Sequence, residues 1–185
     1  VTQDRISGIF LNIPAAKQRV KPCISSNALN SLINLKHLDL SHNNLRSFNF
    51  ESIEKLENLS LFENELDYFS QNLPNLKILE LSLNPLKILN YSVINNKDSM
   101  LETFSIRGCD LKELRSEAFQ NLKYLQYLSI YENDLITYDS NLFFGLSYLE
   151  TVSLNKELSF LHDLKTKYPM VSFIHEPDWI EIDQN

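Results

Sequence analysis

The chain contains little of what marks several large protein classes. It has three glycines and six prolines in 185 residues, too few for a collagen-like or linker-like sequence. No apolar run reaches the roughly 18 residues that a membrane-spanning helix requires, so we expect no membrane span. Acidic residues outnumber basic ones by 24 to 17, and no basic block appears. This balance argues against a nucleic-acid partner, because phosphate backbones favour basic surfaces.

Recognisable catalytic motifs are also missing. The sequence contains no G-x-S-x-G, no glycine-rich phosphate loop, no H-E-x-x-H and no C-x-x-C. These are the spacings that bring together a nucleophile, a phosphate cradle or a set of metal ligands. We therefore expect a protein that is not an enzyme and that carries no cofactor or metal.

What the chain does contain is a repeat. Six segments share a pattern of leucines with one polar position, and their leading leucines stand 20–25 residues apart. The segments are LKHLDLSHNNL (35–45), LENLSLFENEL (56–66), LKILELSLNPL (76–86), LETFSIRGCDL (101–111), LQYLSIYENDL (125–135) and a fading copy, LETVSLNKELS (149–159). The shared pattern, L-x-x-L-x-L-x-x-N-x-L, resembles the leucine-rich repeat family. The resemblance implies an α/β solenoid, a horseshoe with a parallel concave β-sheet and irregular convex loops or short helices.

The leucine spacing also has a direct structural interpretation. In LDL (38–40) the two leucines point to one side of a strand and the aspartate points to the other. The asparagine follows where the chain leaves the strand, and its amide can donate to and accept from backbone groups buried in that turn. We therefore predict a structural ladder, called the asparagine ladder below. Its members are Asn43, Asn64, Asn84, Cys109 and Asn133.

The repeats predict a single domain over residues 1–185. We expect an N-terminal cap over 1–30, about six repeats over 31–160 and a C-terminal cap over 161–185. An apolar last repeat needs such a cover.

Three end segments have readable patterns of their own. RISGIFLNI (5–13) predicts an N-terminal edge strand, HDLKTKYP (162–169) a short helix and VSFI (171–174) a strand. Trp179, with the isoleucines that follow it, is available to close the last repeat.

The two cysteines, Cys23 and Cys109, are predicted to remain unpaired. Cys23 precedes the first repeat and Cys109 lies in the fourth, so at least three strand spacings of about 4.8 Å separate them. That distance is roughly twice the 7 Å between Cα atoms that a disulfide allows.

The longer repeats bear on the compartment. They place Phe119 and Phe143 six residues before the next leading leucine. This spacing resembles the subclass of leucine-rich repeats called typical, which occurs mostly in extracellular proteins and receptor ectodomains. The mixture of short and long repeats is similar to insect immune leucine-rich repeat proteins, including those of mosquitoes. The resemblance implies a secreted or extracellular protein with a role in innate immunity. Two N-x-S sequons, at Asn58 and Asn90, are possible glycosylation sites.

In this family partners usually bind the concave sheet, so the outward columns of the strands indicate candidate contacts with a protein ligand. Large aromatic side chains and one guanidinium fall in these columns, the types that dominate interface energetics. The candidates are Phe62, Arg107, Tyr127 and Tyr131, with His37, His42 and Glu63 near the first strands. The two histidines and Glu63 would also allow a weak metal site or a pH-sensitive contact, but the interpretation we adopt is two solvated histidines on the first strand.

Two further interpretations stay open. The column after the first leucine alternates in charge through Lys36, Glu57, Lys77 and Glu102, which predicts pairing between neighbouring strands and no ligand site. For the whole chain, the alternative to an extracellular module is a cytoplasmic leucine-rich repeat scaffold that regulates protein assembly.

Overall fold

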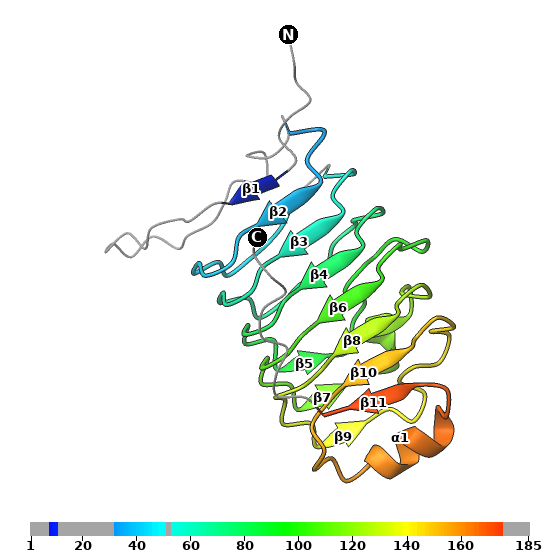
Figure 1. Ribbon diagram of the computed structural model, residues 1–185. Helices are drawn as coiled ribbons and strands as arrows, with labels where there is room; N and C mark the ends of the chain where they lie inside the picture. Colours follow the sequence, from blue (N-terminus) through cyan, green and yellow to red (C-terminus); the bar gives the residue numbers. More distant parts are fainter. Residues whose placement is uncertain (1–7, 11–31, 51–52, 176–185) are drawn as a thin grey trace.

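Each repeat forms one short strand, and the strands stack side by side in a parallel sheet (Figure 1). The computed structural model describes residues 8–10, 32–50 and 53–175. The eight strands of the main sheet lie in chain order. They are β1 (Gly8–Phe10), β2 (His37–Asp39), β3 (Asn58–Ser60), β4 (Ile78–Glu80), β6 (Thr103–Ser105), β8 (Tyr127–Ser129), β10 (Thr151–Ser153) and β11 (Ser172–Ile174). The predicted leucine-rich repeat solenoid is confirmed.

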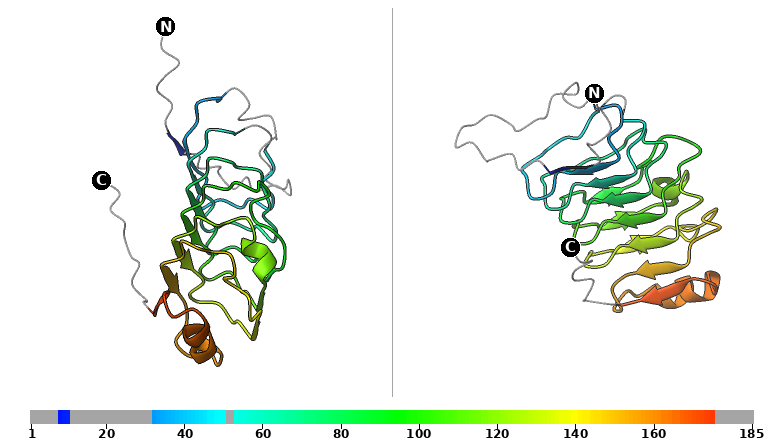
Figure 2. Two further views of the ribbon diagram at one scale, coloured as in Figure 1. Left: turned by 90° about the vertical axis from the view of Figure 1, so that its right-hand side faces the viewer. Right: turned by 45° about the horizontal axis from the view of Figure 1, so that its top comes forward.

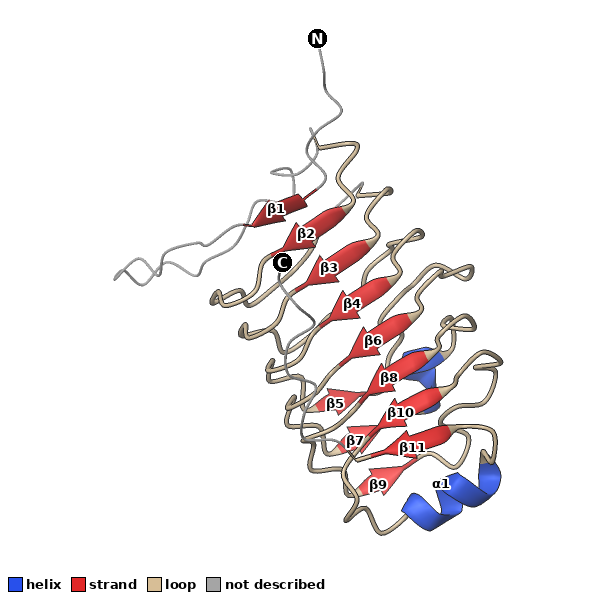
Figure 3. Cartoon of the chain, viewed as in Figure 1, coloured by secondary structure: helices blue, strands red, loops and turns tan. Residues whose placement is uncertain are grey.

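The opposite side of the solenoid is irregular. A second parallel sheet contains β5 (Ile88–Leu89), β7 (Glu113–Leu114) and β9 (Thr137–Tyr138). We call this sheet and the loops around it the outer flank. A 3-10 helix in this flank, η1 (Ser116–Phe119), lies across the molecule from the main sheet (Figure 2). The only α-helix of the described residues, α1 (Leu161–Lys167), lies at the C-terminal end of the stack (Figure 3).

The core lies between the main sheet and the outer loops. In every repeat two apolar residues separated by one position point inward. In the first repeat these are Leu38 and Leu40, which are buried while Asp39 between them is partly exposed. Phe69, Phe104 and Phe119 are the largest fully buried side chains. One continuous apolar cluster runs through the whole stack, because the apolar side of each repeat is covered only by its neighbours.

The asparagine ladder joins successive turns by hydrogen bonds. Asn64 Nδ2 donates to Leu61 O in its own turn and to Leu40 O in the preceding repeat, each at 3.0 Å. Its Oδ1 accepts from Leu45 N at 3.0 Å. Asn84 makes the same bonds one repeat along, donating to Leu61 O and Leu81 O and accepting from Leu66 N. These amides satisfy backbone groups that leave the sheet at the turn.

Cys109 occupies the same position as the asparagines but makes different contacts. Its thiol donates to Leu81 O and Arg107 O at 3.4 and 3.5 Å, and it is free and buried. Burial raises the pKa of the Cys109 thiol to about 12. A thiol is a weaker hydrogen-bonding group than an amide, and the preceding turn adapts, since Leu86 N donates to Asn84 O at 2.8 Å. Cys23 lies outside the described residues.

The residue just before each ladder position has a left-handed backbone. The φ angles are 56° at His42, 54° at Glu63, 55° at Leu83, 60° at Gly108 and 56° at Glu132. Such angles are unfavourable for residues with a Cβ, so the surrounding hydrogen bonds impose them. A Cβ at Gly108 would also lie 2.7 Å from Leu83 Cδ2.

The described end segments agree with the sequence predictions. β1 lies at the N-terminal edge and pairs with β2, within the predicted strand 5–13. α1 and β11 lie within the predicted helix and strand segments, apart from Leu161, which begins α1 one residue early. The rings of Phe143 and Tyr168 meet edge to face at 5.3 Å over the last repeat. Trp179 lies outside the described residues, and the boundaries of the domain and its caps remain predictions.

Candidate protein-binding face

The solvent-exposed side of the eight-stranded sheet, here called the concave face, carries a row of paired charges at its N-terminal end. Glu57 lies between two lysines, with Lys36 Nζ at 2.6 Å and Lys77 Nζ at 3.3 Å. Hydrogen bonds from Lys36 and then Lys77 lower the pKa of Glu57. The sign alternation predicted this pairing, although Glu102 makes no ion pair with any described residue. Glu57 thus balances one of the two lysine charges within the sheet.

A first cluster of candidate residues lies at the ends of β2 and β3. His42 Nδ1 is 2.8 Å from Glu63 Oε2, and the His42 ring meets Phe62 edge to face at 5.2 Å between centroids. His37 is exposed in β2 opposite Asn58, and within the described part of the chain it makes no hydrogen bond or ion pair with this cluster. The described residues hold no group of three or more potential metal ligands, so His42 and Glu63 form a polar pair.

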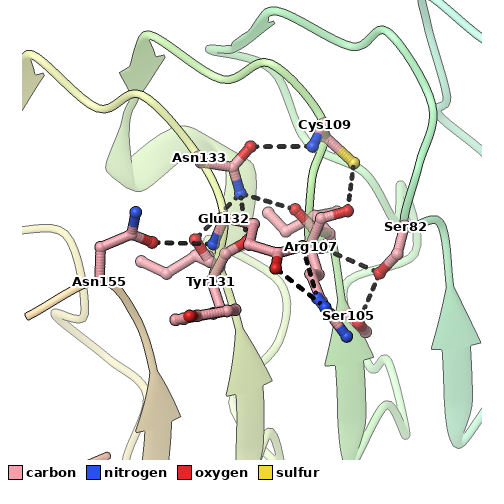
Figure 4. A network of polar contacts seen from close by, with 10 residues as sticks. Ser82, Ser105, Arg107, Cys109, Tyr131, Glu132, Asn133 and Asn155 are labelled. Carbon is pink, nitrogen blue, oxygen red and sulfur yellow. Dashed lines mark hydrogen bonds and ion pairs between the residues drawn. The ribbon is translucent and has the colours of Figure 1, made fainter. Parts of the chain in front are cut away.

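A second cluster lies at the ends of β6 and β8 (Figure 4). Arg107 donates through Nε and Nη2 to the two carboxylate oxygens of Glu132, at 2.8 and 2.9 Å. The Arg107 guanidinium also lies 5.7 Å from the centre of the Tyr131 ring. The bidentate bond raises the pKa of Arg107 and lowers that of Glu132. The structure thus brings together Arg107 and Tyr131 and adds Glu132, which we had not selected from the sequence.

Glu132 could have been found from the repeat register. It directly precedes the ladder residue Asn133, as Glu63 precedes Asn64. In both cases the glutamate pairs with a cation or histidine one repeat earlier, Arg107 in the second cluster and His42 in the first.

The backbone beneath the second cluster is held by side chains from both neighbouring repeats. Ser82 Oγ accepts from Arg107 N at 2.9 Å and lies 2.7 Å from Ser105 Oγ. On the other side, Asn155 Oδ1 accepts from Glu132 N at 2.8 Å. Ser82 belongs to the column expected to face water, yet it is only 2% exposed, because the next repeat covers it.

Glu80 supplies a half-buried carboxylate on the same face. Its Oε1 accepts from Ser82 N at 2.7 Å. Burial raises the pKa of Glu80, opposed by hydrogen bonds from Ser82 and Ser105 and by the charge of Arg107.

The remaining candidates are distributed over both sides of the molecule. Tyr127 begins β8 and is partly exposed on the concave face. Asn58 lies in β3, with His37 and Ile78 opposite it on the neighbouring strands, and is partly exposed. Asn90 is exposed on the outer flank, immediately after β5. Of the two sequons, only the one at Asn58 lies on the concave face.

Comparison with known proteins identifies relatives of this chain. Two family models described as leucine-rich repeat match residues 34–56 and 99–157. Toll-like receptor 3 of Homo sapiens is 33% identical over 78% of this chain, and that of Boselaphus tragocamelus is 30% identical over 65%. The chain spans only about 15% of the length of these relatives.

A solved structure gives a similar result for the fold. A chain in the Toll–Spatzle complex of Drosophila matches with a TM-score of 0.60 over 72% of this chain and 18% of that one. The sequence identity of this pair is 21%, so the match concerns the fold. In the described part of our chain, no helix is long and apolar enough to cross a bilayer.

Proposed function

This chain is a leucine-rich repeat protein, and we propose that it is an extracellular, non-enzymatic recognition module of innate immunity. It binds a protein partner through its concave face. The identity to Toll-like receptor 3 supports the immune and extracellular parts of this proposal. The Toll–Spatzle complex is itself a molecular hub in Drosophila development and innate immunity.

The observation that carries the binding proposal is the second cluster. Arg107, Tyr131 and Glu132 form a charged and aromatic group whose backbone is fixed by Ser82 and Asn155. Side chains held in place before binding lose little conformational freedom when a partner arrives. Arg and Tyr are also the side chains most often found to dominate binding energy.

The ion pair between Arg107 and Glu132 limits which N–H groups of Arg107 a partner can contact. The guanidinium already uses Nε and Nη2 toward Glu132, so a ligand carboxylate meets the remaining N–H groups of Arg107 and not a vacant fork. We therefore expect a partner that packs an apolar or aromatic surface on Tyr131 and places a single acceptor beside Arg107.

The charges of the concave face favour a protein over a nucleic acid. Lys36 and Lys77 are paired with Glu57, and Arg107 is paired with Glu132. Nucleic-acid binding depends on cations available to replace counterions along the phosphate backbone. Two carboxylates balance two of these three positive charges, so the face offers shape and aromatic contact more than a positive field.

The test begins by immobilising this chain and using it to purify a binding partner from extracts of the native source. Each concave variant is then titrated with that partner. Tyr131→Ala and Arg107→Ala should each weaken binding by about 2 kcal/mol or more, because both remove an anchor. Lys77→Glu is the matched control on the same face, and it should change binding less because that column pairs with itself. Arg107→Ala leaves Glu132 unpaired, so the double variant with Glu132→Ala separates loss of the anchor from the unpaired charge.

Two results would contradict the proposal. The first is normal binding by the concave variants while substitutions in the outer loop 91–100 abolish it. The second is a glycan on Asn58 in the binding-competent protein, because an oligosaccharide at the start of β3 would cover the strands around it.

A further inference from the structure

We infer that Asn90 is an N-glycosylation site that carries an oligosaccharide on the outer flank of the solenoid. This inference goes beyond partner binding, and the first support is chemical. Asn90, Tyr91 and Ser92 form an N-x-S sequon, the acceptor motif for N-linked glycan. The donor class is an oligosaccharide linked to a lipid diphosphate. Asn90 Nδ2 bonds to C1 of the first sugar while the C1–O bond to the diphosphate breaks. The diphosphate leaves with the electron pair, and the amide loses one proton to a base.

The backbone around Asn90 points its side chain outward. Ile88 and Leu89 form β5, with Leu89 buried and Ile88 exposed. Because side chains alternate along an extended chain, Asn90 shares the outward side with Ile88, and it is exposed. Its amide makes no hydrogen bond to any residue that the structure describes, so attachment of a sugar removes no native contact.

The two residues that complete the sequon are anchored. Tyr91 Oη accepts from Phe69 N at 3.4 Å, and its ring packs on Tyr68 at 4.5 Å between centroids. Ser92 Oγ donates to Ile94 O at 2.7 Å and accepts from Asn121 Nδ2 at 3.1 Å. The folded chain therefore presents Asn90 on a fixed base beside two aromatic rings.

A glycan on Asn90 shields exposed apolar side chains on the surface next to it. Ile88 is 44% exposed and Ile136, two strands along, is 70% exposed, and both line a groove with Lys87 and Lys112. A hydrated oligosaccharide beside Ile88 covers these exposed apolar side chains and keeps them from contact with other molecules. It does so on the side of the molecule away from the concave face.

The experiment places a secretory leader before the chain in animal cells, so that acceptor competence is measured whatever the native compartment. The secreted protein is analysed by intact mass before and after treatment with peptide N-glycosidase. A peptide map then reports conversion of Asn90 to aspartate by the enzyme. We expect the peptide containing Asn90 to be glycosylated in most of the secreted chain.

Two variants sharpen the result. Asn90→Gln should abolish the glycan on this peptide while the protein melts at the temperature of the enzymatically deglycosylated parent, since Asn90 makes no described native contact. Ser92→Thr keeps the hydroxyl and should keep the glycan. An unmodified Asn90 peptide in the secreted, folded parent would overturn the inference, and that measurement decides the matter even where the variant is poorly secreted.

This outcome is separate from the outcome of the binding test. A glycosylated Asn90 with concave variants that bind normally would refute the binding proposal alone. A bare Asn90 in a chain whose concave variants lose binding would refute the glycosylation inference alone.

Discussion

Replacing Asn64 with alanine removes one amide that joins two turns of the solenoid. Asn64 is 7% exposed, so water does not readily replace its bonds. Two of the carbonyls it serves keep another partner. Leu40 O still accepts from Asn43 Nδ2 at 2.9 Å, and Leu61 O still accepts from Asn84 Nδ2 at 2.8 Å. The loss of the Asn64 donor is therefore largely compensated by the rest of the ladder.

The loss of the acceptor is not compensated. Leu45 N donates to Asn64 Oδ1 at 3.0 Å, and the described residues offer it no second acceptor. A buried N–H left without a partner costs about 1–3 kcal/mol. We expect Asn64→Ala to lower the free energy of unfolding by that amount, as measured by urea denaturation monitored by circular dichroism.

Cys109→Ala is the matched control, since it removes a ladder side chain without stranding a backbone group. Leu86 N already donates to Asn84 O, and Leu81 O keeps its bond from Asn84 Nδ2. Asn133→Ala is the opposite case, because Asn133 Oδ1 accepts from both Cys109 N and Leu111 N. The expected order of destabilisation is Asn133→Ala above Asn64→Ala above Cys109→Ala. Equal losses for all three, or an Asn64 variant as stable as the parent, would refute the assignment of the amide to the Leu45 N–H.

Two other predictions concern titratable groups. Burial raises the pKa of Glu80 above its ordinary value of 4.5, so its contribution to stability is full below pH 4.5 and is lost as the pH rises through the folded-state pKa. Glu80→Gln should therefore gain stability relative to the parent between pH 4 and pH 7 in urea titrations, and a difference independent of pH would contradict this. Cys109, with its pKa raised to about 12, should resist alkylation at pH 8 as long as the chain is folded. After unfolding without a reductant, a thiol titration should find two free thiols per chain. A labelled Cys109 peptide from folded protein would disprove its protection.

Features that depend on a single repeat could be predicted from the sequence. Leu38 and Leu40 are buried because two residues along a strand face the same side, and this holds whatever the neighbouring repeats contain. The ladder amides follow for the same reason, since every turn leaves the sheet with the same unpaired backbone groups. α1 and β11 were also readable, because each has a local pattern of its own.

Features that depend on contacts between repeats were predicted less well. Ser82 stands in the same column as Phe62 and Arg107, yet it is buried, with its hydroxyl bonded to Ser105 Oγ and Arg107 N of the next repeat. Asn155 accepts from Glu132 N. The repeat pattern did not predict this contact, because Asn155 lies two residues before position 157, where the pattern places its asparagine and the sequence has Glu157.

The repeat period and the alternation of leucines are enough to specify the solenoid, the inward side of each strand and the positions of the ladder. Each of these follows from backbone geometry that recurs in every turn. The composition of the concave face depends on the tertiary structure. Whether Arg107 meets solvent or Glu132 depends on strand register and on side-chain conformations across a gap of 25 residues in sequence. The physical reason is that a column of the sheet joins residues whose separation varies with the length of each outer loop, so only the folded stack determines which side chains touch.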